Sequence, residues 1–232
     1  MRLDYHKILP TIISLSYLTS RASSFTSKSA PRVFNPQTLS FTSSSSRLHG
    51  TSTSTTTDNN NPILPPIPDT AKRLFLVRHG EVIPPGGVHG VFYGALDVPL
   101  SPLGELEAEA AATYLQQFDL EHVASSPLKR AIYGAKETMK VQPGQEKEVV
   151  IYDGFTELDR GSWCGKTKVE IGEDLMNRFD ACDESVTPEG GESYSFLKNR
   201  VLQARDDLLS TMSCGKASAV VSHLQVTRSM LR

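Results

Sequence analysis

Two histidines in this sequence each follow a short apolar run, and both have the chemistry to act on phosphate. His79 is the second residue after the run at 74–77 and stands between Arg78 and Gly80. A neutral imidazole nitrogen is a good nucleophile near pH 7, an arginine offers phosphate oxygens a planar fork of donors, and a glycine lets the backbone approach a ligand. His223 ends a second apolar run, VVSH, and in its protonated form it could bind phosphate oxygens and stabilise a transition state. Taken singly, either histidine also fits an ordinary hydrogen-bonded residue at a strand end.

Two further charged residues are candidates for the same chemistry. Arg130 lies in SSPLKRA, where a turn followed by a helix start would offer backbone N–H groups and the arginine would add positive charge. Lys129 precedes it, and since consecutive helical residues diverge by about 100°, we expect only one of the two to face a site. Glu157, in FTELDRGSWCG, is a candidate proton donor, because a carboxyl group of raised pKa can protonate a leaving oxygen. Asp159 competes with it for this role.

Apolar periodicity predicts how these residues are positioned. We expect strands at the start of the segments 72–80, 122–140, 148–158 and 217–232, and amphipathic helices over 101–118, the second half of 122–140 and 192–212. Strands that alternate with helices predict a layered α/β domain. In such sheets ligands bind beyond the carboxyl ends of the strands, which is where we expect Arg78, His79, Ser126 and His223.

Six motifs together resemble the histidine phosphatase superfamily, the phosphoglycerate-mutase-like proteins. They are LVRHGE (76–81), DVPLSPLGELEAEAA (97–111), SSPLKRA (125–131), ELDRGSWCGKT (157–167), GGES (190–193) and VVSH (220–223). They occur in the family order and cover nearly all of 72–232, which makes them far more specific than the RHG tripeptide alone. The fold that we expect is a three-layer α/β/α domain with a mostly parallel central sheet.

The resemblance implies a role for each candidate residue. His79 would be the nucleophile that is transiently phosphorylated, and Glu157 would be the proton donor. The residues that would hold the phosphoryl group are Arg78, Arg130 and His223, and those that would lie near the substrate are Tyr93, Gly94, Glu192 and Ser193. The implied activity is hydrolysis of a phosphomonoester, a small phosphorylated metabolite, through a phosphohistidine. The superfamily uses no metal or other cofactor, and the sequence offers no cluster of metal ligands.

The loop after His79 departs from the pattern of the mutases. Those proteins carry RHGES-x-W-N, whereas here RHGE is followed by VIPPGG, without Trp-Asn. This difference favours a phosphatase, and GVFYGALDVPLSPLG resembles the small-phosphatase branch that includes α-ribazole phosphatases. Fructose-2,6-bisphosphatase-like activity is another branch. Two alternatives stay open: phosphoryl transfer of the phosphoglycerate mutase type, and a catalytically inactive phosphate-binding module.

The sequence ends nine residues after His223. Members of the superfamily continue there with a helix and a further strand that packs on the sheet. The resemblance therefore implies that C-terminal elements of the domain are missing from this sequence.

The first 70 residues differ in composition from the rest. They contain 25 Ser or Thr, six Lys or Arg, three Asp and no Glu, whereas the remainder holds 18 basic and 23 acidic residues. The apolar run at 8–18 is shorter than the roughly 20 residues that a membrane span needs, and it is typical of a signal peptide. The stretch that follows resembles a transit peptide. We predict a disordered targeting leader over 1–57, a Pro/Asn-rich linker over 58–70 and the domain over 71–232. The leader predicts delivery to an organelle, a plastid before a mitochondrion, with secretion as the other alternative.

Charge and cysteine content narrow the possible partners. The mild acidity of 71–232 gives no basic surface for nucleic acid, and the apolar run is too short for a stable membrane anchor. Cys164, Cys182 and Cys214 are odd in number and lack a CxxC spacing, which argues against a disulfide framework or a zinc site. We expect them to be reduced and at least half-buried. The partner that we expect is a small phosphorylated substrate; the oligomeric state is left open.

Overall fold

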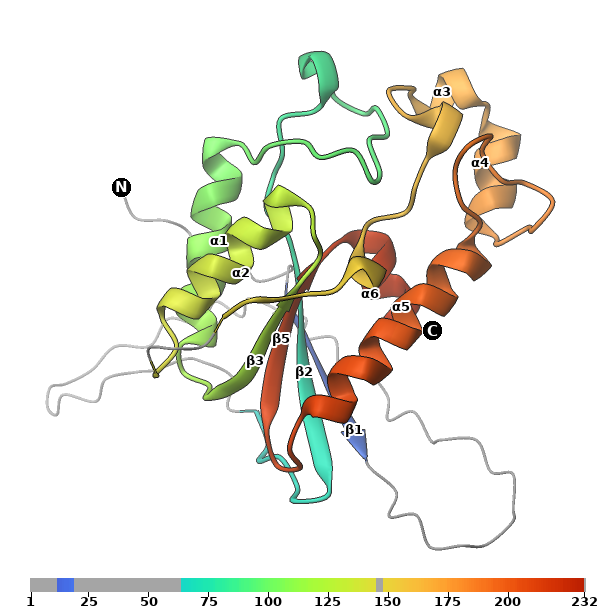
Figure 1. Cartoon of the computed structure of the whole chain (residues 1–232). Coiled ribbons are helices and arrows are strands. Elements are labelled where there is room, and N and C mark those ends of the chain that lie inside the picture. Colours follow the sequence, from blue (N-terminus) through green and yellow to red (C-terminus); the bar gives the residue numbers. More distant parts are fainter. Residues whose placement is uncertain (1–11, 19–63, 145–147, 232) are drawn as a thin grey trace, which may run out of the picture. The chain divides into compact units, whose positions relative to one another are not determined.

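The computed structural model describes residues 12–18, 64–144 and 148–231. In this part of the chain five strands form one sheet in the order β1-β2-β5-β3-β4 (Figure 1). The strands are β1 (Ile12–Leu18), β2 (Ala71–Arg78), β3 (Leu120–Ser125), β4 (Val150–Ile151) and β5 (Ala217–Ser222). Four of them run parallel, and β1 is antiparallel to β2. The expected mostly parallel sheet is therefore confirmed.

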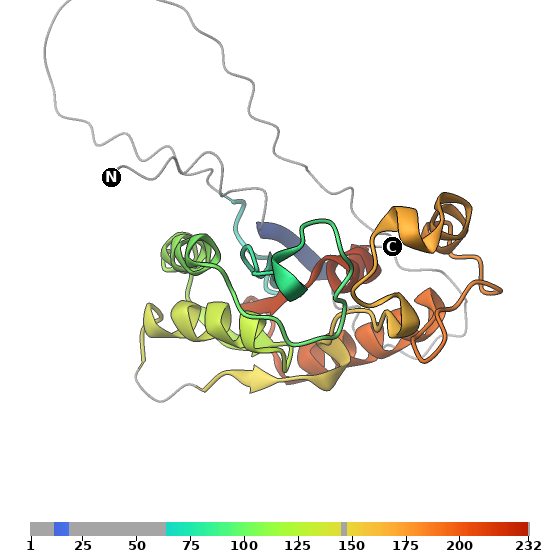
Figure 2. The same ribbon diagram turned by 90° about the horizontal axis from the view of Figure 1, so that it is seen from above.

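Helices cover both faces of this sheet (Figures 1 and 2). On one face lie α1 (Pro102–Leu115) and α2 (Lys129–Lys140), and on the other lie α5 (Tyr194–Thr211) and α6 (Leu224–Leu231). Successive strand residues point to opposite faces. In β5, Val220 joins the core that contains Leu197 and Val201 of α5, while Val221 reaches Gly134 of α2. Both faces of the sheet are thus apolar and covered, which gives the expected three layers.

Two short helices, α3 (Lys168–Ile171) and α4 (Glu173–Asp180), were not expected from the sequence. A capping box starts the first: the Thr167 hydroxyl accepts from the backbone N–H of Glu170, whose carboxylate accepts from the N–H of Thr167. The second buries only Met176 and Phe179. So few apolar positions over so short a stretch leave no periodicity to detect. The 3-10 turns Pro85–Gly87, Asp153–Phe155 and Gly161–Trp163 complete the described elements.

Strand β1 differs from the expectation for the leader. The prediction was that residues 1–57 are disordered, but Ile12–Leu18 pairs along the edge of β2, from Ile12 opposite Val77 to Leu18 opposite Ala71. An edge strand exposes a row of unpaired backbone groups, and a run rich in Ile, Leu and Tyr has a high propensity to pair with it. The remainder of 1–57, and residues 58–63 of the linker, lie outside the described residues. A targeting role for this segment stays a prediction.

The candidate histidines meet at one edge of the sheet, as expected from the parallel strands. β5 lies between β2 and β3, so the carboxyl ends of all three strands are adjacent. The pairing continues just beyond them: the N–H of His79 donates to the carbonyl of Ser222 (3.0 Å), and the N–H of Ser126 donates to the carbonyl of Val221 (3.1 Å). The residues that follow the three strands are therefore held in register with one another.

Candidate active site

His79 is presented as a neutral imidazole at the end of β2. Its side chain is buried, and Nδ1 lies 2.7 Å from the carbonyl oxygen of Gly80. A carbonyl only accepts, so Nδ1 carries the proton and donates, and Nε2 keeps its lone pair. Burial, with the positive charges of Arg130 and Arg78, lowers the pKa of His79 to about 3, although the bond to Gly80 opposes this shift. The residue thus holds a free nucleophilic nitrogen at neutral pH.

His223 stands beside it at the end of β5. The two ring centroids are 5.1 Å apart in an edge-on arrangement. His223 is fully buried, its Nε2 lies 2.7 Å from the hydroxyl of Ser126, and its Nδ1 has no hydrogen-bond partner among the described residues. Burial, followed by the proximity of His79 and Arg130, lowers the pKa of His223 well below its ordinary value. The sequence interpretation invoked a protonated His223, whereas in the free protein this residue is neutral.

Arg130 supplies the buried positive charge. Its side chain is almost fully enclosed, and the two terminal nitrogens donate to the carbonyl oxygens of Gly94 and Leu96, each at 2.7 Å. The guanidinium carbon lies 5.4 Å from the ring centroid of Tyr93, and Nε has no partner among the described residues. Lys129 instead points outward, with 86% of its side chain exposed, and pairs with Asp97 at 3.6 Å. Of the two neighbours on α2, Arg130 is therefore the one that faces the site.

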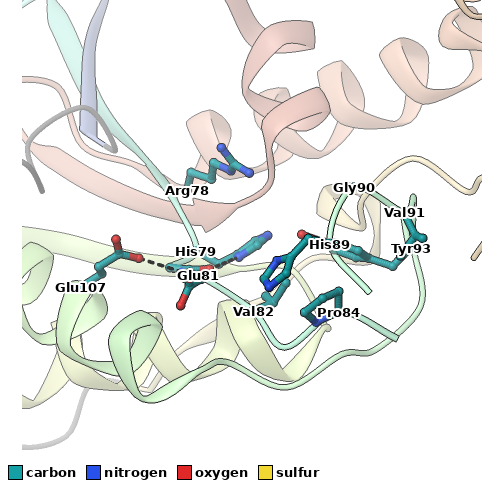
Figure 3. A pocket seen from close by; sticks show the side chains of 11 residues that line it. Arg78, His79, Glu81, Val82, Pro84, His89, Gly90, Val91, Tyr93 and Glu107 are labelled. Atoms are coloured by element: carbon teal, nitrogen blue, oxygen red, sulfur yellow. Dashed lines mark hydrogen bonds between the residues drawn. The ribbon is translucent and has the colours of Figure 1, made fainter. Parts of the chain in front are cut away.

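Arg78 and His79 line a cavity of about 400 Å³ with the loop that follows them. Figure 3 shows both residues at the end of β2, with the ring of His79 directed toward His89. The remaining lining residues are Gly80, Glu81, Val82, Pro84, His89, Gly90, Val91, Tyr93 and Glu107. Tyr93, expected near the substrate, is thus part of the cavity wall. His89, Glu81 and Glu107 were not singled out from the sequence, because isolated polar residues in a loop and a helix carry no pattern.

Gly80 has a packing role that the sequence did not reveal. A Cβ on Gly80 would lie 2.3 Å from the carbonyl oxygen of Gly104, and one on Gly104 would lie 1.9 Å from that of Glu81. These are backbone atoms, which no rotamer change can move away. The first turn of α1 therefore touches the chain directly behind the nucleophile, and the hydroxyl of Ser101 adds a 2.5 Å bond to the carboxylate of Glu81.

Glu157 is a half-buried carboxyl group on the loop after β4. Its Oε1 accepts from the N–H of Leu158 at 2.7 Å, and its Oε2 accepts from the N–H of Gln225 at 3.4 Å. Burial raises the pKa of Glu157, and these hydrogen bonds and the charges of Arg160 and Arg130 hold the rise back. Asp159 is exposed and accepts from the N–H of Gly161 in a local turn. Glu157, whose pKa is raised by burial, is thus the stronger candidate for the proton donor.

A second cavity, of about 370 Å³, adjoins Glu157. Its other lining residues are Ala95, Asp153, Thr156, Asp159, Gly191, Glu192, Phe196 and Arg200. Gly94 packs closely against the loop that carries Glu157, since a Cβ on Gly94 would lie 2.3 Å from the carbonyl oxygen of Leu158. Two residues predicted to contact substrate have protein partners here: Glu192 pairs with Arg200, and the Ser193 hydroxyl caps α5 by accepting from the N–H of Phe196. Substrate contact by Gly94, Glu192 and Ser193 stays a prediction.

Among residues 12–18, 64–144 and 148–231 there is no group of three or more His, Cys, Asp or Glu that could hold a metal ion. The same residues include no helix that is both long and apolar enough to span a membrane. None of the three cysteines, Cys164, Cys182 and Cys214, forms a disulfide in the described part of the chain. All three are exposed, so the expectation that they are at least half-buried is wrong. Cys182 and Cys214 follow the ends of α4 and α5, and Cys164 follows a 3-10 turn, where the chain lies at the surface.

Comparisons with known proteins agree with this geometry. A family model described as the histidine phosphatase superfamily (branch 1) matches residues 74–232. A bifunctional protein of Mycobacterium tuberculosis is 33% identical over 167 residues, which are 70% of this chain and 44% of that protein. Phosphoserine phosphatase 1 of Hydrogenobacter thermophilus is 32% identical over 161 residues, 68% of this chain and 74% of that one. The chain thus spans less than half of the length of the first relative and about three quarters of the second.

A solved structure shares the fold. Phosphoserine phosphatase from Entamoeba histolytica, in complex with 3-phosphoglyceric acid, is 26% identical and superposes with a TM-score of 0.57. The match covers 69% of this chain and 78% of that one.

Proposed function

This chain belongs to the histidine phosphatase superfamily (branch 1), and we propose that it is a phosphomonoester hydrolase that forms a phosphohistidine on His79. One observation carries the proposal: the His79 side chain is buried and neutral, and its Nδ1 donates its proton to the carbonyl of Gly80, which leaves the lone pair on Nε2. The ring lies 5.1 Å from that of His223, and the charges of Arg130 and Arg78 act on it. That arrangement suits nucleophilic attack on a phosphorus atom whose oxygens are bound by cations. The relatives named as phosphoserine phosphatases support hydrolysis and a small phosphorylated metabolite as substrate.

In the first step Nε2 of His79 attacks phosphorus, an N–P bond forms, and the P–O bond to the leaving alcohol breaks. Glu157 in its acid form donates its proton to the leaving oxygen. Burial raises the pKa of Glu157, which favours the acid form that this step needs. In the second step water attacks the phosphohistidine, Glu157 as carboxylate takes a proton from the water, and the N–P bond breaks to release inorganic phosphate. His79 and Glu157 return to their starting forms.

The charge that develops on the phosphoryl oxygens is stabilised by Arg78, Arg130 and His223. The free Nε–H of Arg130 is a donor that a phosphate oxygen can accept from. His223 is neutral in the free protein, and a phosphate dianion beside it would raise its pKa and favour the protonated form. Substrate binding would thus favour the protonation that burial disfavours in the free protein.

Two other functions are separated by direct assay. Incubation with 3-phosphoglycerate, followed separately for free phosphate and for 2-phosphoglycerate, distinguishes a hydrolase from a mutase. A protein that binds phosphate esters but converts none of them would be a binding module. We favour the hydrolase, because the five residues needed for catalysis are present and the loop after Glu81 lacks the Trp-Asn of the mutases.

The test begins with phosphate release from a panel of phosphoserine, 3-phosphoglycerate, sugar phosphates and nucleoside monophosphates. The best substrate is then used with a ³²P label, and the reaction is quenched during turnover. We expect acid-labile label on His79, and we expect His79→Ala to lose turnover entirely. Turnover without label on the protein, or a His79→Ala variant that keeps about a tenth of the rate, would overturn the proposal.

A further inference from the structure

One arginine outside the reacting groups organises the loop that carries Glu157. Arg200 projects from α5, and each of its five guanidinium N–H groups has an acceptor. Three of them donate to backbone carbonyl oxygens of that loop: those of Gly154 (2.9 Å), Thr156 (2.7 Å) and Glu157 (3.2 Å). The other two donate to the carboxylate of Glu192, through Nε at 3.0 Å and through a terminal nitrogen. All five donors of the guanidinium therefore form hydrogen bonds, either to this loop or to the carboxylate of Glu192.

Glu192 also contacts the backbone of the loop on the C-terminal side of Glu157. Its Oε1, which accepts from a terminal nitrogen of Arg200, also accepts from the N–H of Asp159 at 3.0 Å. The N–H of Glu192 donates to the carbonyl of Asp159 at 3.1 Å. The pair is largely enclosed, with side-chain exposures of 21% for Arg200 and 10% for Glu192. Backbone groups before and after Glu157 are thus bound by one ion pair that is shielded from water.

We propose that Arg200 and Glu192 are positioning residues that hold Glu157 where it can protonate the leaving oxygen. The inference rests on the proposed function. It gives a role to Arg200 and Glu192, which take no part in the two chemical steps themselves. The physical reason is the shape of the guanidinium: five donors in a rigid plane span three carbonyls and a carboxylate, and the three donors of a lysine ammonium cannot. A loop released by as little as about 1 Å would lower the rate of proton transfer by up to about 100-fold.

The test uses the full chain with conservative variants. Arg200→Lys keeps the charge but removes the fork, and Glu192→Gln keeps the shape but removes the charge. Arg178→Lys is the matched control, because Arg178 also bonds a carboxylate and a hydroxyl, those of Asp183 and Ser185, but at an exposed position away from Glu157. Circular dichroism confirms that each variant is folded before kinetics are measured.

The diagnostic measurement compares two leaving groups. An alkyl phosphate such as glycerol 2-phosphate needs a proton on its leaving oxygen, whereas p-nitrophenyl phosphate releases a phenolate that does not. We expect Arg200→Lys and Glu192→Gln to lower kcat/KM for the alkyl ester by about 10- to 100-fold and for the aryl ester by less than about threefold. Arg178→Lys should leave both values unchanged. Equal losses on the two esters, or losses no larger than those of Arg178→Lys, would overturn the inference.

The pH profile gives a second readout. The charged groups around Glu157 are Arg130 of α2, Arg160 of the same loop, Arg200 of α5, and Asp153, Asp159 and Glu192 of the adjoining cavity. A released loop is more hydrated, which moves the pKa of Glu157 back toward its ordinary range. The alkaline limb of kcat/KM for the alkyl ester should therefore shift to lower pH in Arg200→Lys, although the net charge is the same.

A third readout does not depend on turnover. Amide hydrogen exchange of residues 154–159 should become at least about tenfold faster in Arg200→Lys and stay unchanged in Arg178→Lys. Unchanged exchange in Arg200→Lys would refute the positioning role whatever the activity. A wild-type protein that hydrolyses neither ester would count against the proposed function, while the exchange data would still decide the inference.

Discussion

The first turn of α1 contacts the segment that follows His79, and this contact leads to a specific prediction for Gly104→Ala. The added Cβ would lie 1.9 Å from the carbonyl oxygen of Glu81 and 2.8 Å from its nitrogen and carbonyl carbon. An ordinary contact is about 1.5 Å longer than the first of these distances, and every atom involved belongs to the backbone. α1 and the segment after His79 must therefore move apart by roughly that amount.

The size of the effect follows from two opposing terms. Overpacking of this kind costs about 1–3 kcal/mol, and its upper end applies because no side chain can give way. Replacement of glycine by alanine in a helix returns about 1 kcal/mol. We expect a net loss of about 2 kcal/mol, which lowers the Tm by roughly 4–8 °C in a domain of this size. Because the shift occurs next to the nucleophile, kcat/KM should fall by about 100-fold.

Gly134→Ala on α2 is the matched control. Its Cβ would meet a side-chain methyl of Val221 at 3.3 Å and the Cβ of Ala108 at 3.7 Å, which small adjustments can accommodate. This variant should gain helix propensity and melt at or slightly above the wild-type temperature. Thermal unfolding followed by circular dichroism, together with phosphate release, measures both effects. A Gly104→Ala protein as stable and as active as Gly134→Ala would refute the reasoning.

Three further predictions follow. Because burial lowers the pKa of His79 from 6.5 to about 3, the unfolded chain binds a proton that the folded chain does not, and stability falls as the pH decreases through this range. His79→Asn should reduce the stability lost between pH values of about 7.5 and 5.5 by about 1.4 kcal/mol in urea titrations; an unchanged loss would contradict the low pKa. Glu107→Gln removes a negative charge from the cavity wall and should lower KM for carboxylate-bearing esters about two- to fivefold relative to uncharged ones, whereas an equal change for both classes would argue against an electrostatic effect. A fluorescent protein fused after residues 1–60 should enter an organelle, a plastid in an algal host, and a diffuse cytosolic signal would end the targeting hypothesis.

The parts of the site that the sequence predicts are those with a local signature. An apolar run that ends at His79 or His223 indicates a buried strand, and parallel strands bring their carboxyl ends to one edge. The helix over 101–118 was predictable because Ser101 caps it and Pro102 starts it, and the structure ends it three residues earlier, at Leu115. These features depend on residues that are neighbours in the sequence, so they can be predicted without knowledge of the tertiary structure.

The parts that it does not predict depend on contacts between distant segments. Lys129 and Arg130 look equivalent in the sequence, and only the carbonyl oxygens of Gly94 and Leu96 decide that Arg130 turns inward. The role of Arg200 depends in the same way on a loop more than 40 residues earlier in the chain. A polar residue on an amphipathic helix is an ordinary surface charge until its partners are known.

The protonation state of His223 likewise depends on its surroundings, because residue type alone does not reveal burial. Burial and nearby positive charges disfavour the protonated form in the free protein, whereas a bound phosphate dianion would favour it. Arg130 contributes to each part of this balance. Its charge lowers the pKa of both histidines and restrains the rise of the pKa of Glu157. Arg130 therefore favours the unprotonated form of all three groups. This adds to the effect of burial at His79, which must be neutral to attack, and it opposes the effect of burial at Glu157, which must hold a proton to donate one. Burial thus favours the form that each of these two groups needs in the first step, and the charge of Arg130 assists only the nucleophile.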